Sequence, residues 1–488
     1  MKKLNIPVFI MLFTATVLLV ISCAVNPVTG KKQLMLMSEA QEIQLGASYH
    51  PQVMATFGEY PDNNLQNFVQ TKGTEIGKIS HRPNLEYHVK VVDSPVVNAF
   101  AVPGGYVYLT RGILAQLNNE AEMMGVLAHE MGHIAARHTV SQQSKQQLAQ
   151  LLLIGGMIAS EKFAQYAQYA LQGMQLLFLS FSRDDERQAD ALGVEYSSKM
   201  GYDAHKMADF FKVLQKMSLS ESEGGVPTFL STHPDPGDRY NDVNTQATEW
   251  QKTLNLAEFK VNQDSYLQMI NGIIYGEDPR QGYVEGNTFY HPDLKFLFSF
   301  PTGWKLENSP LQVIMTPSDQ KALMLFTLAS QKTLEAAVDS TIAQYQLSLM
   351  GSKRTTVNGL QAIMTQSKQS VQDQSTGATQ TNMVLSAFIS YNNLIYVFHG
   401  VTTEADFNSY ANTFNSSMTT FARLTDASKI NVKPKKVQVV KVQRTGTLND
   451  AFAYYRVPQA QYKELALLND LELTDQVPAG KLIKIIGE

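Results

Sequence analysis

The segment His129-Glu130-Met131-Gly132-His133 constrains this chain more than any other feature of its sequence. Asn119 with Glu122 three residues later forms a capping pair that predicts the start of a helix, and apolar residues at helical spacing carry that helix through the segment. Because an α-helix turns once every 3.6 residues, the two histidines lie on one face. Two imidazole nitrogens on one face can bind the same Zn²⁺, so we expect this helix to form part of a metal site.

Glu130 lies beside the metal-facing side of the same helix and has the chemistry of a general base. It is placed to take a proton from a metal-activated water and to pass that proton to the leaving amine. A catalytic zinc also needs a third protein ligand and an open position. The segment 182–193 predicts a helix that presents Glu186 and Asp190 one turn apart, as candidate ligand and candidate hydrogen-bond acceptor for a ligand histidine. Without the histidine pair, such an acidic pair would more simply be a solvated helix face.

Together with Asn98-Ala-Phe-Ala-Val-Pro103-Gly104-Gly105 upstream, these segments resemble the gluzincin metallopeptidase family of HtpX and the CAAX prenyl endopeptidases. Within that family the chain resembles the soluble periplasmic BepA-like branch, over roughly residues 26 to 265. The resemblance implies a zincin-type fold with one Zn²⁺ per chain and Glu130 as its catalytic base. The implied metal ligands are His129, His133 and Glu186, with Asp190 supporting a ligand.

The segment 98–102 predicts a short strand that Pro103 and the two glycines after it bring to an end. The family resemblance makes this strand the edge of the cleft. An unpaired edge binds an extended peptide through main-chain hydrogen bonds, which suits substrates of varied sequence. The implied substrate-binding residues are Asn98, Ala99, Phe100 and Ala101; the alternative is an ordinary hairpin strand.

The segment Thr232-His233-Pro-Asp-Pro-Gly-Asp-Arg239 resembles the family's loop over the site. The resemblance implies that His233 approaches the metal and that Arg239 stabilises the oxyanion of the reaction. A His233 that blocks the zinc would keep the enzyme latent. The simpler interpretations, a loop histidine and a surface ion pair, stay open from the sequence alone.

The N-terminus has the pattern of an export signal, in which Met1-Lys2-Lys3 precedes an uncharged and mostly apolar stretch. The next residues, Val20 to Cys23, resemble a bacterial lipobox, which predicts cleavage of residues 1–22 and acylation of Cys23, the only cysteine. By resemblance to lipoprotein sorting rules, Ala24 rather than Asp after the cysteine implies the periplasmic face of the outer membrane of a Gram-negative cell. The alternative is an uncleaved membrane helix, and both interpretations tether a soluble body to a membrane.

Changes in composition and pattern divide the rest of the chain into three predicted domains with linkers. The predicted fold class is α+β multidomain: a helix-rich peptidase domain with a small β-sheet, an α/β sandwich-like domain, and a small βααβ module. The predicted segments are a lipidated tether at 23–38, the peptidase domain at 39–265, a linker at 266–284, the α+β domain at 285–425, a linker at 426–436 and the terminal module at 437–488.

The last two domains carry weaker resemblances. The middle domain faintly resembles PsbP through Phe300-Pro-Thr-Gly-Trp304 and its strand order. This resemblance predicts no function for the domain. Arg444-Thr-Gly-Thr-Leu448 and Val477-Pro-Ala-Gly480 make the terminal module similar to LysM, a fold that binds N-acetylglucosamine polymers. Peptidoglycan is therefore a candidate partner, and a protein-docking or purely structural role is equally open.

Other features exclude partners or add no chemistry. The 40 basic and 44 acidic residues leave a net charge of −4, so nucleic acid is not an expected partner. The segment 141–181 predicts a helical hairpin that packs in the core, with contact at a membrane interface as the alternative. The histidines outside the site are expected to be structural or exposed. Among them, His138 would be rotated by about 140° from His133 on a straight helix and could not share its metal.

The sequence thus predicts a zinc-dependent endopeptidase of the bacterial cell envelope that hydrolyses misfolded or unfolded envelope proteins. The quality-control role rests on family analogy and the bond class rests on the site. One alternative is a latent-site chaperone or cell-wall-binding scaffold in which His233 is a permanent fourth ligand. Another is a cell-wall peptide hydrolase that the terminal module targets to its substrate.

Overall fold

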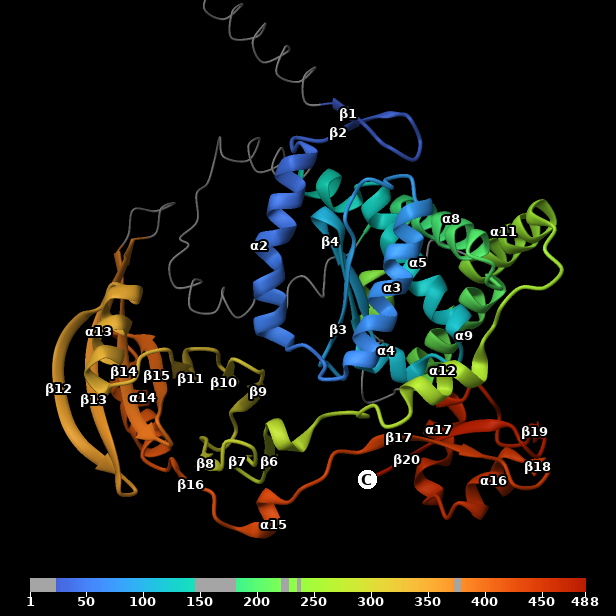
Figure 1. Ribbon diagram of the computed structural model, residues 1–488. Coiled ribbons are helices and arrows are strands. Elements are labelled where there is room, and N and C mark those ends of the chain that lie inside the picture. Colours follow the sequence, from blue (N-terminus) through green and yellow to red (C-terminus); the bar gives the residue numbers. More distant parts are fainter. Residues whose placement is uncertain (1–22, 145–180, 221–227, 235–237, 373–378) are drawn as a thin grey trace, which may run out of the picture.

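The computed structural model describes residues 23–144, 181–220, 228–234, 238–372 and 379–488 (Figure 1). The signal at 1–22 and most of the hairpin at 141–181 lie outside these residues, and acylation of Cys23 stays a prediction. The described chain is a mixed helix and sheet protein of several domains, and its first domain is mainly helical. Within the described ranges, no helix is long and apolar enough to cross a membrane.

The first domain places a small sheet among helices. In the sheet order β3-β5-β4, β3 pairs with β5 in parallel and β4 lies antiparallel at one edge. Its elements, after the β1 (Cys23–Val25) and β2 (Lys32–Leu34) pair, are α2 (Glu39–Phe57), α3 (Asn63–Ile79), β3 (His88–Val92), β4 (Ala99–Val102), the 3-10 turn η1 (Pro103–Gly105), β5 (Tyr106–Thr110), α4 (Arg111–Gln116), α5 (Glu120–Ala135), α8 (Arg183–Lys199), α9 (His205–Ser220), α10 (Thr228–Thr232), α11 (Arg239–Leu254) and α12 (Gln263–Ile270).

The two helices that carry the predicted metal ligands each begin at an N-cap residue that the sequence identifies. In α5, the side chain of Asn119 accepts a hydrogen bond from Glu122 N at 2.9 Å, and the Glu122 carboxylate accepts one from Asn118 N at 2.7 Å. In α8, Ser182 and Asp185 form a reciprocal capping box. These contacts satisfy free N–H groups and fix where each helix starts, so both predicted helices are confirmed.

Close packing brings α8 against α5. A Cβ added at Gly132 would lie 3.1 Å from Leu192 Cβ and 3.3 Å from Ala189 O, so only glycine allows this separation without displacement. Every residue of α5 is buried. The approach places the acidic residues of α8 directly beside the histidines of α5.

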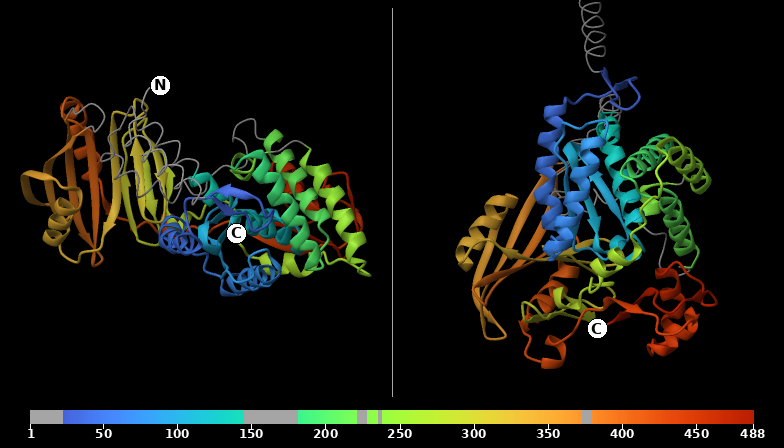
Figure 2. Two further views of the ribbon diagram at one scale, coloured as in Figure 1. Left: turned by 90° about the horizontal axis from the view of Figure 1, so that it is seen from above. Right: turned by 45° about the vertical axis from the view of Figure 1, so that its right-hand side comes forward.

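The second domain is built on antiparallel sheets, visible at one end of the molecule in Figure 2. One sheet has seven strands in the order β12-β13-β14-β15-β11-β10-β9, and the other has four in the order β16-β8-β7-β6. The elements are the 3-10 turn η2 (Pro279–Gln281), β6 (Tyr283–Glu285), β7 (Thr288–His291), β8 (Phe296–Ser299), β9 (Lys305–Asn308), β10 (Gln312–Thr316), β11 (Ala322–Ala329), α13 (Leu334–Tyr345), β12 (Ser348–Val357), β13 (Leu360–Gln372), β14 (Thr379–Tyr391), β15 (Leu394–Thr403), α14 (Phe407–Met418), β16 (Ala422–Arg423) and α15 (Ala427–Ile430).

The predicted helix near 334–349 is too long at its C-terminal end. Gln346 has a left-handed φ of 52°, which ends α13 at Tyr345, and Leu349 lies in β12 instead. Sequence pattern also missed β12 and β13, because serine, threonine, glutamine and charged residues fill much of these strands. The residues of β12 are almost all exposed, so no apolar face marks it as a strand.

The C-terminal module packs against the first domain and shares part of its hydrophobic core. Val437 is fully buried within the core of the first domain, and its N–H and C=O bond to Ile273 O and Gly272 N at 2.9 and 2.8 Å. Its elements are β17 (Lys436–Lys441), β18 (Gly446–Thr447), α16 (Leu448–Tyr454), the 3-10 turn η3 (Gln459–Gln461), α17 (Tyr462–Leu468), β19 (Gln476–Val477) and β20 (Leu482–Gly487), with β17 antiparallel to β20.

Lys484 of β20 provides the most specific contact of this interface. Its ammonium donates to the carbonyl oxygens of Ala115, Gln116 and Leu117 at 2.9, 3.0 and 3.0 Å. These carbonyls end α4, where the helix leaves acceptors without intrahelical donors. Burial lowers the pKa of Lys484, and Glu122 at the start of α5 opposes that shift. The module is thereby linked electrostatically to the helix that carries the histidines.

We predict that Lys484→Met lowers the free energy of unfolding by about 3–5 kcal/mol, because it leaves three buried carbonyls without their donor and removes the cation that offsets the charge of Glu122. Urea denaturation of the full chain measures this effect. Lys463→Met, which changes an exposed lysine of the same module, is the matched control and is expected to stay within about 0.5 kcal/mol. Equal stability of the two variants would contradict the docking role of Lys484.

Candidate metal centre

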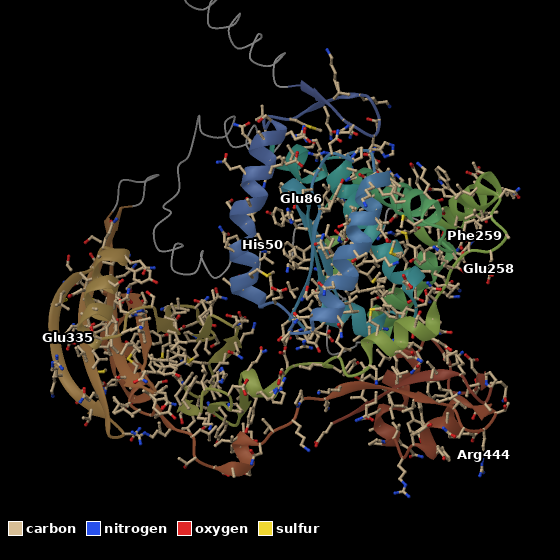
Figure 3. All side chains as sticks on the ribbon, viewed as in Figure 1. His50, Glu86, Glu258, Phe259, Glu335 and Arg444 are labelled. Carbon is tan, nitrogen blue, oxygen red and sulfur yellow. The ribbon has the colours of Figure 1, made fainter. Side chains whose placement is uncertain are left out.

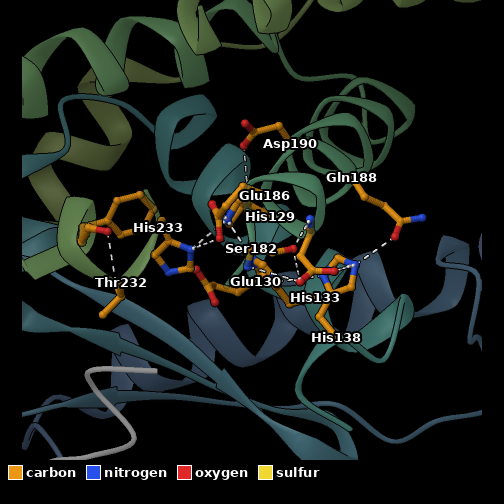
Figure 4. Close-up of polar contacts among 12 residues, drawn as sticks. His129, Glu130, His133, His138, Ser182, Glu186, Gln188, Asp190, Thr232 and His233 are labelled. Carbon is orange, nitrogen blue, oxygen red and sulfur yellow. Dashed lines mark hydrogen bonds and ion pairs between the residues drawn. The ribbon is translucent and has the colours of Figure 1, made fainter. Parts of the chain in front are cut away.

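Helix α5 brings the two motif histidines together as predicted. His129 and His133 are fully buried, and their Nε2 atoms lie 3.1 Å apart (Figure 4). When both rings carry their proton on Nδ1, the facing Nε2 atoms present lone pairs that repel across this short gap. A cation between them removes this repulsion.

Helix α8 supplies the carboxylate predicted as the third ligand. Glu186 is fully buried, with one oxygen 3.6 Å from His129 Nε2 and the other 3.5 Å from His133 Nε2. Burial alone would raise the pKa of Glu186. The nearby charges of His233, His129 and Arg239 together lower it by more, so the pKa lies below its ordinary value. The carboxylate is therefore anionic where the imidazole nitrogens converge.

His233 is the fourth residue of the buried group and contacts both His129 and Glu186. It follows α10, and its Nδ1 lies 3.3 Å from His129 Nε2 and 3.0 Å from Glu186 Oε1. The ring of Phe229 stacks on it with centroids 4.5 Å apart. The structure thus places His233 within the buried group instead of in a free loop, and metal binding by His233 stays a prediction.

Five separations within this group are close to those expected around a zinc ion. Ligand atoms about 2.0–2.1 Å from a tetrahedral zinc lie about 3.3–3.4 Å from one another. The separations given above range from 3.0 to 3.6 Å. Among the described residues, His129, His133, Glu186 and His233 form a buried group with all ligand atoms within 4.8 Å of one another. The donor set of three imidazoles and one carboxylate suits Zn²⁺.

Glu130 lies beside this group and is fully buried. Burial raises its pKa above the ordinary value, against the opposing charges of His233 and His129. His233 Nε2 is 3.4 Å from one Glu130 oxygen. Within the part of the chain that the structure describes, neither Glu130 oxygen accepts a hydrogen bond. A buried carboxylate without donors is costly, which indicates that a polar molecule belongs beside it.

Asp190 and Arg239 lie behind the ligands. Asp190 Oδ1 is 3.0 Å from His129 Nδ1, where it can accept the ring proton. The Arg239 guanidinium donates to both Asp190 oxygens at 2.6 and 2.7 Å and to Glu186 Oε2 at 3.3 Å. The structure thus brings Arg239 to two buried carboxylates, and its role at an oxyanion stays a prediction.

Strand β4 lies at the edge of the three-stranded sheet, the position required if it binds an extended substrate peptide. Asn98 precedes it, and the Asn98 side chain accepts a hydrogen bond from Ala99 N at 3.0 Å. Residues Ala99, Phe100 and Ala101 are buried. Phe229 N donates to Val97 O at 3.2 Å, so the helix before His233 is attached to the chain entering β4. Substrate binding by these residues stays a prediction.

The sequence reasoning missed His138. Helix α5 ends at Ala135, and Arg137 has a left-handed φ of 57°, so the straight-helix premise is wrong. His138 returns to the site with its Nδ1 2.9 Å from His133 Nδ1. The ring of Phe181 stacks on His133 with centroids 3.9 Å apart. No local pattern signals either contact.

Comparison with known sequences supports the metallopeptidase interpretation. Residues 63–247 match the description "Peptidase family M48", and this range contains every residue of the group. The "Beta-barrel assembly-enhancing protease" of Yersinia pestis is 29% identical over 231 residues, which cover 46% of this chain and 47% of that protein. The chain therefore spans about half the length of such relatives. "Mitochondrial metalloendopeptidase OMA1" of Arabidopsis thaliana is 29% identical over 177 residues, covering 36% and 34% of the two chains.

Comparison with solved structures adds no functional information. The solution structure of cyanobacterial PsbP from Synechocystis sp. PCC 6803 covers 28% of this chain and 91% of its own. Its sequence identity is 11% and its TM-score is 0.23, too low to carry an argument. The PsbP likeness of the middle domain, the LysM likeness of the terminal module and the assignment to HtpX and CAAX relatives stay predictions.

Proposed function

We propose that this protein is a zinc-dependent endopeptidase of the bacterial cell envelope that hydrolyses unfolded or misfolded envelope proteins. The observation that carries the proposal is the buried group of three histidines and one glutamate with Glu130 beside it. The match to a peptidase family supports it independently, since that match comes from sequence. The envelope assignment is supported by the relatives named as β-barrel assembly-enhancing proteases and by the predicted anchor at Cys23 on the periplasmic face of the outer membrane.

Bound Zn²⁺ would supply Lewis acidity to the scissile carbonyl and to the attacking water. His129, His133 and Glu186 would hold it. Asp190 keeps the proton of His129 on Nδ1, so that the Nε2 lone pair points toward the other ligands. Arg239 holds Asp190 with two hydrogen bonds and neutralises part of the buried negative charge.

Glu130 is the proton carrier of the proposed reaction. Its buried carboxylate has a raised pKa, which makes it a stronger base than an exposed glutamate. It takes a proton from the attacking water and delivers it to the nitrogen of the leaving amine. Because neither oxygen accepts a hydrogen bond from the described residues, a water molecule can bind there for this transfer.

His233 makes the described arrangement a closed one. A catalytic zinc keeps one position open, and His233 Nδ1 lies where the fourth ligand would bind. A substrate strand that pairs with β4 would compete with Phe229 for Val97 O and loosen the helix before His233. Substrate binding and opening of the site are thus coupled in the proposal. A permanently latent scaffold is less well supported, because the relatives are named as proteases.

We predict that Glu130→Gln lowers the rate of casein hydrolysis by about 10²- to 10⁴-fold, the usual contribution of a general acid–base residue. The assay uses the zinc-loaded protein, and zinc content by mass spectrometry is expected to stay at one per chain. Wild-type rates in the variant would contradict the role of Glu130.

We predict that His233→Ala raises casein hydrolysis about tenfold, the gain expected if the open site is populated in about one molecule in ten. His205→Ala, which changes a partly exposed histidine of the same domain, is the control. A His233→Ala variant that keeps its zinc and shows no gain would rule out the blocking role.

A second binding activity is proposed for the terminal module. A cavity of about 330 Å³ there is lined by Arg444, Asp450, Tyr454 and Tyr455. Tyr454 is 57% exposed, and its ring offers an apolar face of the kind on which sugars stack. Figure 3 shows Arg444 on the side of the module that faces away from the first domain. These features support the predicted partner, peptidoglycan, which would place the peptidase near the cell wall.

We predict that Tyr454→Ala lowers retention on insoluble peptidoglycan about fivefold or more, the effect of losing one contact of about 1 kcal/mol. Tyr240→Ala, which changes an exposed tyrosine of the first domain, is the control. Co-sedimentation measures retention, and equal retention of both variants would exclude this cavity as the glycan site.

A further inference from the structure

His133 uses both of its ring nitrogens. Its Nε2 faces His129 and Glu186, and its Nδ1 lies 2.9 Å from His138 Nδ1. His138 is almost completely buried. Two histidines that meet nitrogen to nitrogen need one donor and one acceptor.

Metal binding decides which nitrogen donates. A His133 that presents a lone pair at Nε2 must carry its proton on Nδ1, and it therefore donates to His138 Nδ1. His138 must then be the neutral tautomer with its proton on Nε2. Metal binding at His133 Nε2 thus determines the proton position on His133, which in turn determines the proton position on His138.

Gln188 occupies the position that this tautomer requires. Its Oε1 lies 2.9 Å from His138 Nε2, so it accepts the remaining proton. Asp185 Oδ1 also faces Nε2, but at 3.7 Å it lies beyond hydrogen-bond distance. The reversed proton order would place a proton on His133 Nε2 and exclude the metal.

We infer that His138 is a positioning residue for the metal ligand His133, and that Gln188 fixes the tautomer of His138. The inference rests on the proposed metal site and adds residues that act through a ligand. It also explains why α8 carries Gln188 between Glu186 and Asp190. One helix supplies a ligand, the carboxylate behind His129 and the amide that supports His133.

The chain secures this arrangement by a turn with its own partners. The left-handed Arg137 redirects the backbone after α5, and its Nε donates to Glu42 Oε2 at 2.8 Å. Arg82 donates to the other Glu42 oxygen at 2.8 Å and to Ile134 O at 3.0 Å. These contacts hold the end of α5 in the form that returns His138 to His133.

The two ligand histidines are therefore supported differently. His129 faces the carboxylate of Asp190, which Arg239 neutralises, while His133 faces a neutral ring. A neutral acceptor orients His133 without a further negative charge in the buried site. This limits the charge that would otherwise weaken the metal as a Lewis acid.

The test measures the zinc dissociation constant of the full-length protein by competition with a chromogenic chelator, which requires no catalysis. His138→Leu removes the acceptor, and His138→Gln restores one through its amide oxygen. Gln188→Leu frees the tautomer of His138. Gln143→Leu, which changes a partly buried glutamine that contacts Tyr49, is the matched control.

We expect His138→Leu to raise the zinc dissociation constant about 10- to 100-fold, as loss of a ligand's hydrogen-bond partner does elsewhere. His138→Gln is expected within about threefold of wild type and Gln188→Leu between the two, while Gln143→Leu matches wild type. The inference is overturned if His138→Leu binds zinc like wild type, or if His138→Gln binds as weakly as His138→Leu.

If His138→Leu does not fold, as judged by circular dichroism of the metal-free protein, Gln188→Leu decides the question. Zinc binding equal to that of Gln143→Leu would then overturn the inference. Failure of this test is distinguishable from failure of the proposed function, because the latter would appear as absent zinc binding or absent hydrolysis in the wild-type protein.

Discussion

The close packing of α8 against α5 is the contact on which the rest of the site depends. Gly132 lets the helices approach until Glu186 lies between the two histidines of α5. Capped starts fix both helices along their axes, so the ligands meet in register. A Cβ at position 132 would lie 3.1 Å from Leu192 Cβ and 3.3 Å from Ala189 O, so α8 would have to shift slightly away from α5.

Burial of so much charge is sustained by pairing each group with an opposite charge or a defined hydrogen-bond partner. Arg239 faces Asp190 and Glu186, and Lys484 closes the carbonyl end of α4 next to the start of α5. Glu130 differs, since its oxygens accept no hydrogen bond from the described residues and His233 Nε2 approaches only to 3.4 Å. The charged groups behind the ligands are paired, while the carboxylate that would move protons accepts no hydrogen bond from the described residues, as expected of a functional site.

The sequence predicted what is local and missed what depends on distant partners. The helices carrying His129 and Glu186 were predictable because caps and periodicity lie within each segment. His138 was not, because the turn at Arg137 depends on Glu42, almost a hundred residues earlier. Lys484 appears as an ordinary strand lysine, since its acceptor Leu117 O lies 367 residues away. Strands β12 and β13 lacked the apolar alternation that marks a half-buried strand.

The central claim is that one zinc ion binds inside the buried group formed by α5, α8 and His233. Diffraction from crystals of the wild-type protein, recorded on both sides of the zinc absorption edge, tests it most directly. The account predicts a single anomalous peak in contact with His129 Nε2, His133 Nε2, a Glu186 oxygen and His233 Nδ1. A crystal grown with zinc that shows no peak there, or a peak held by other residues, would contradict it.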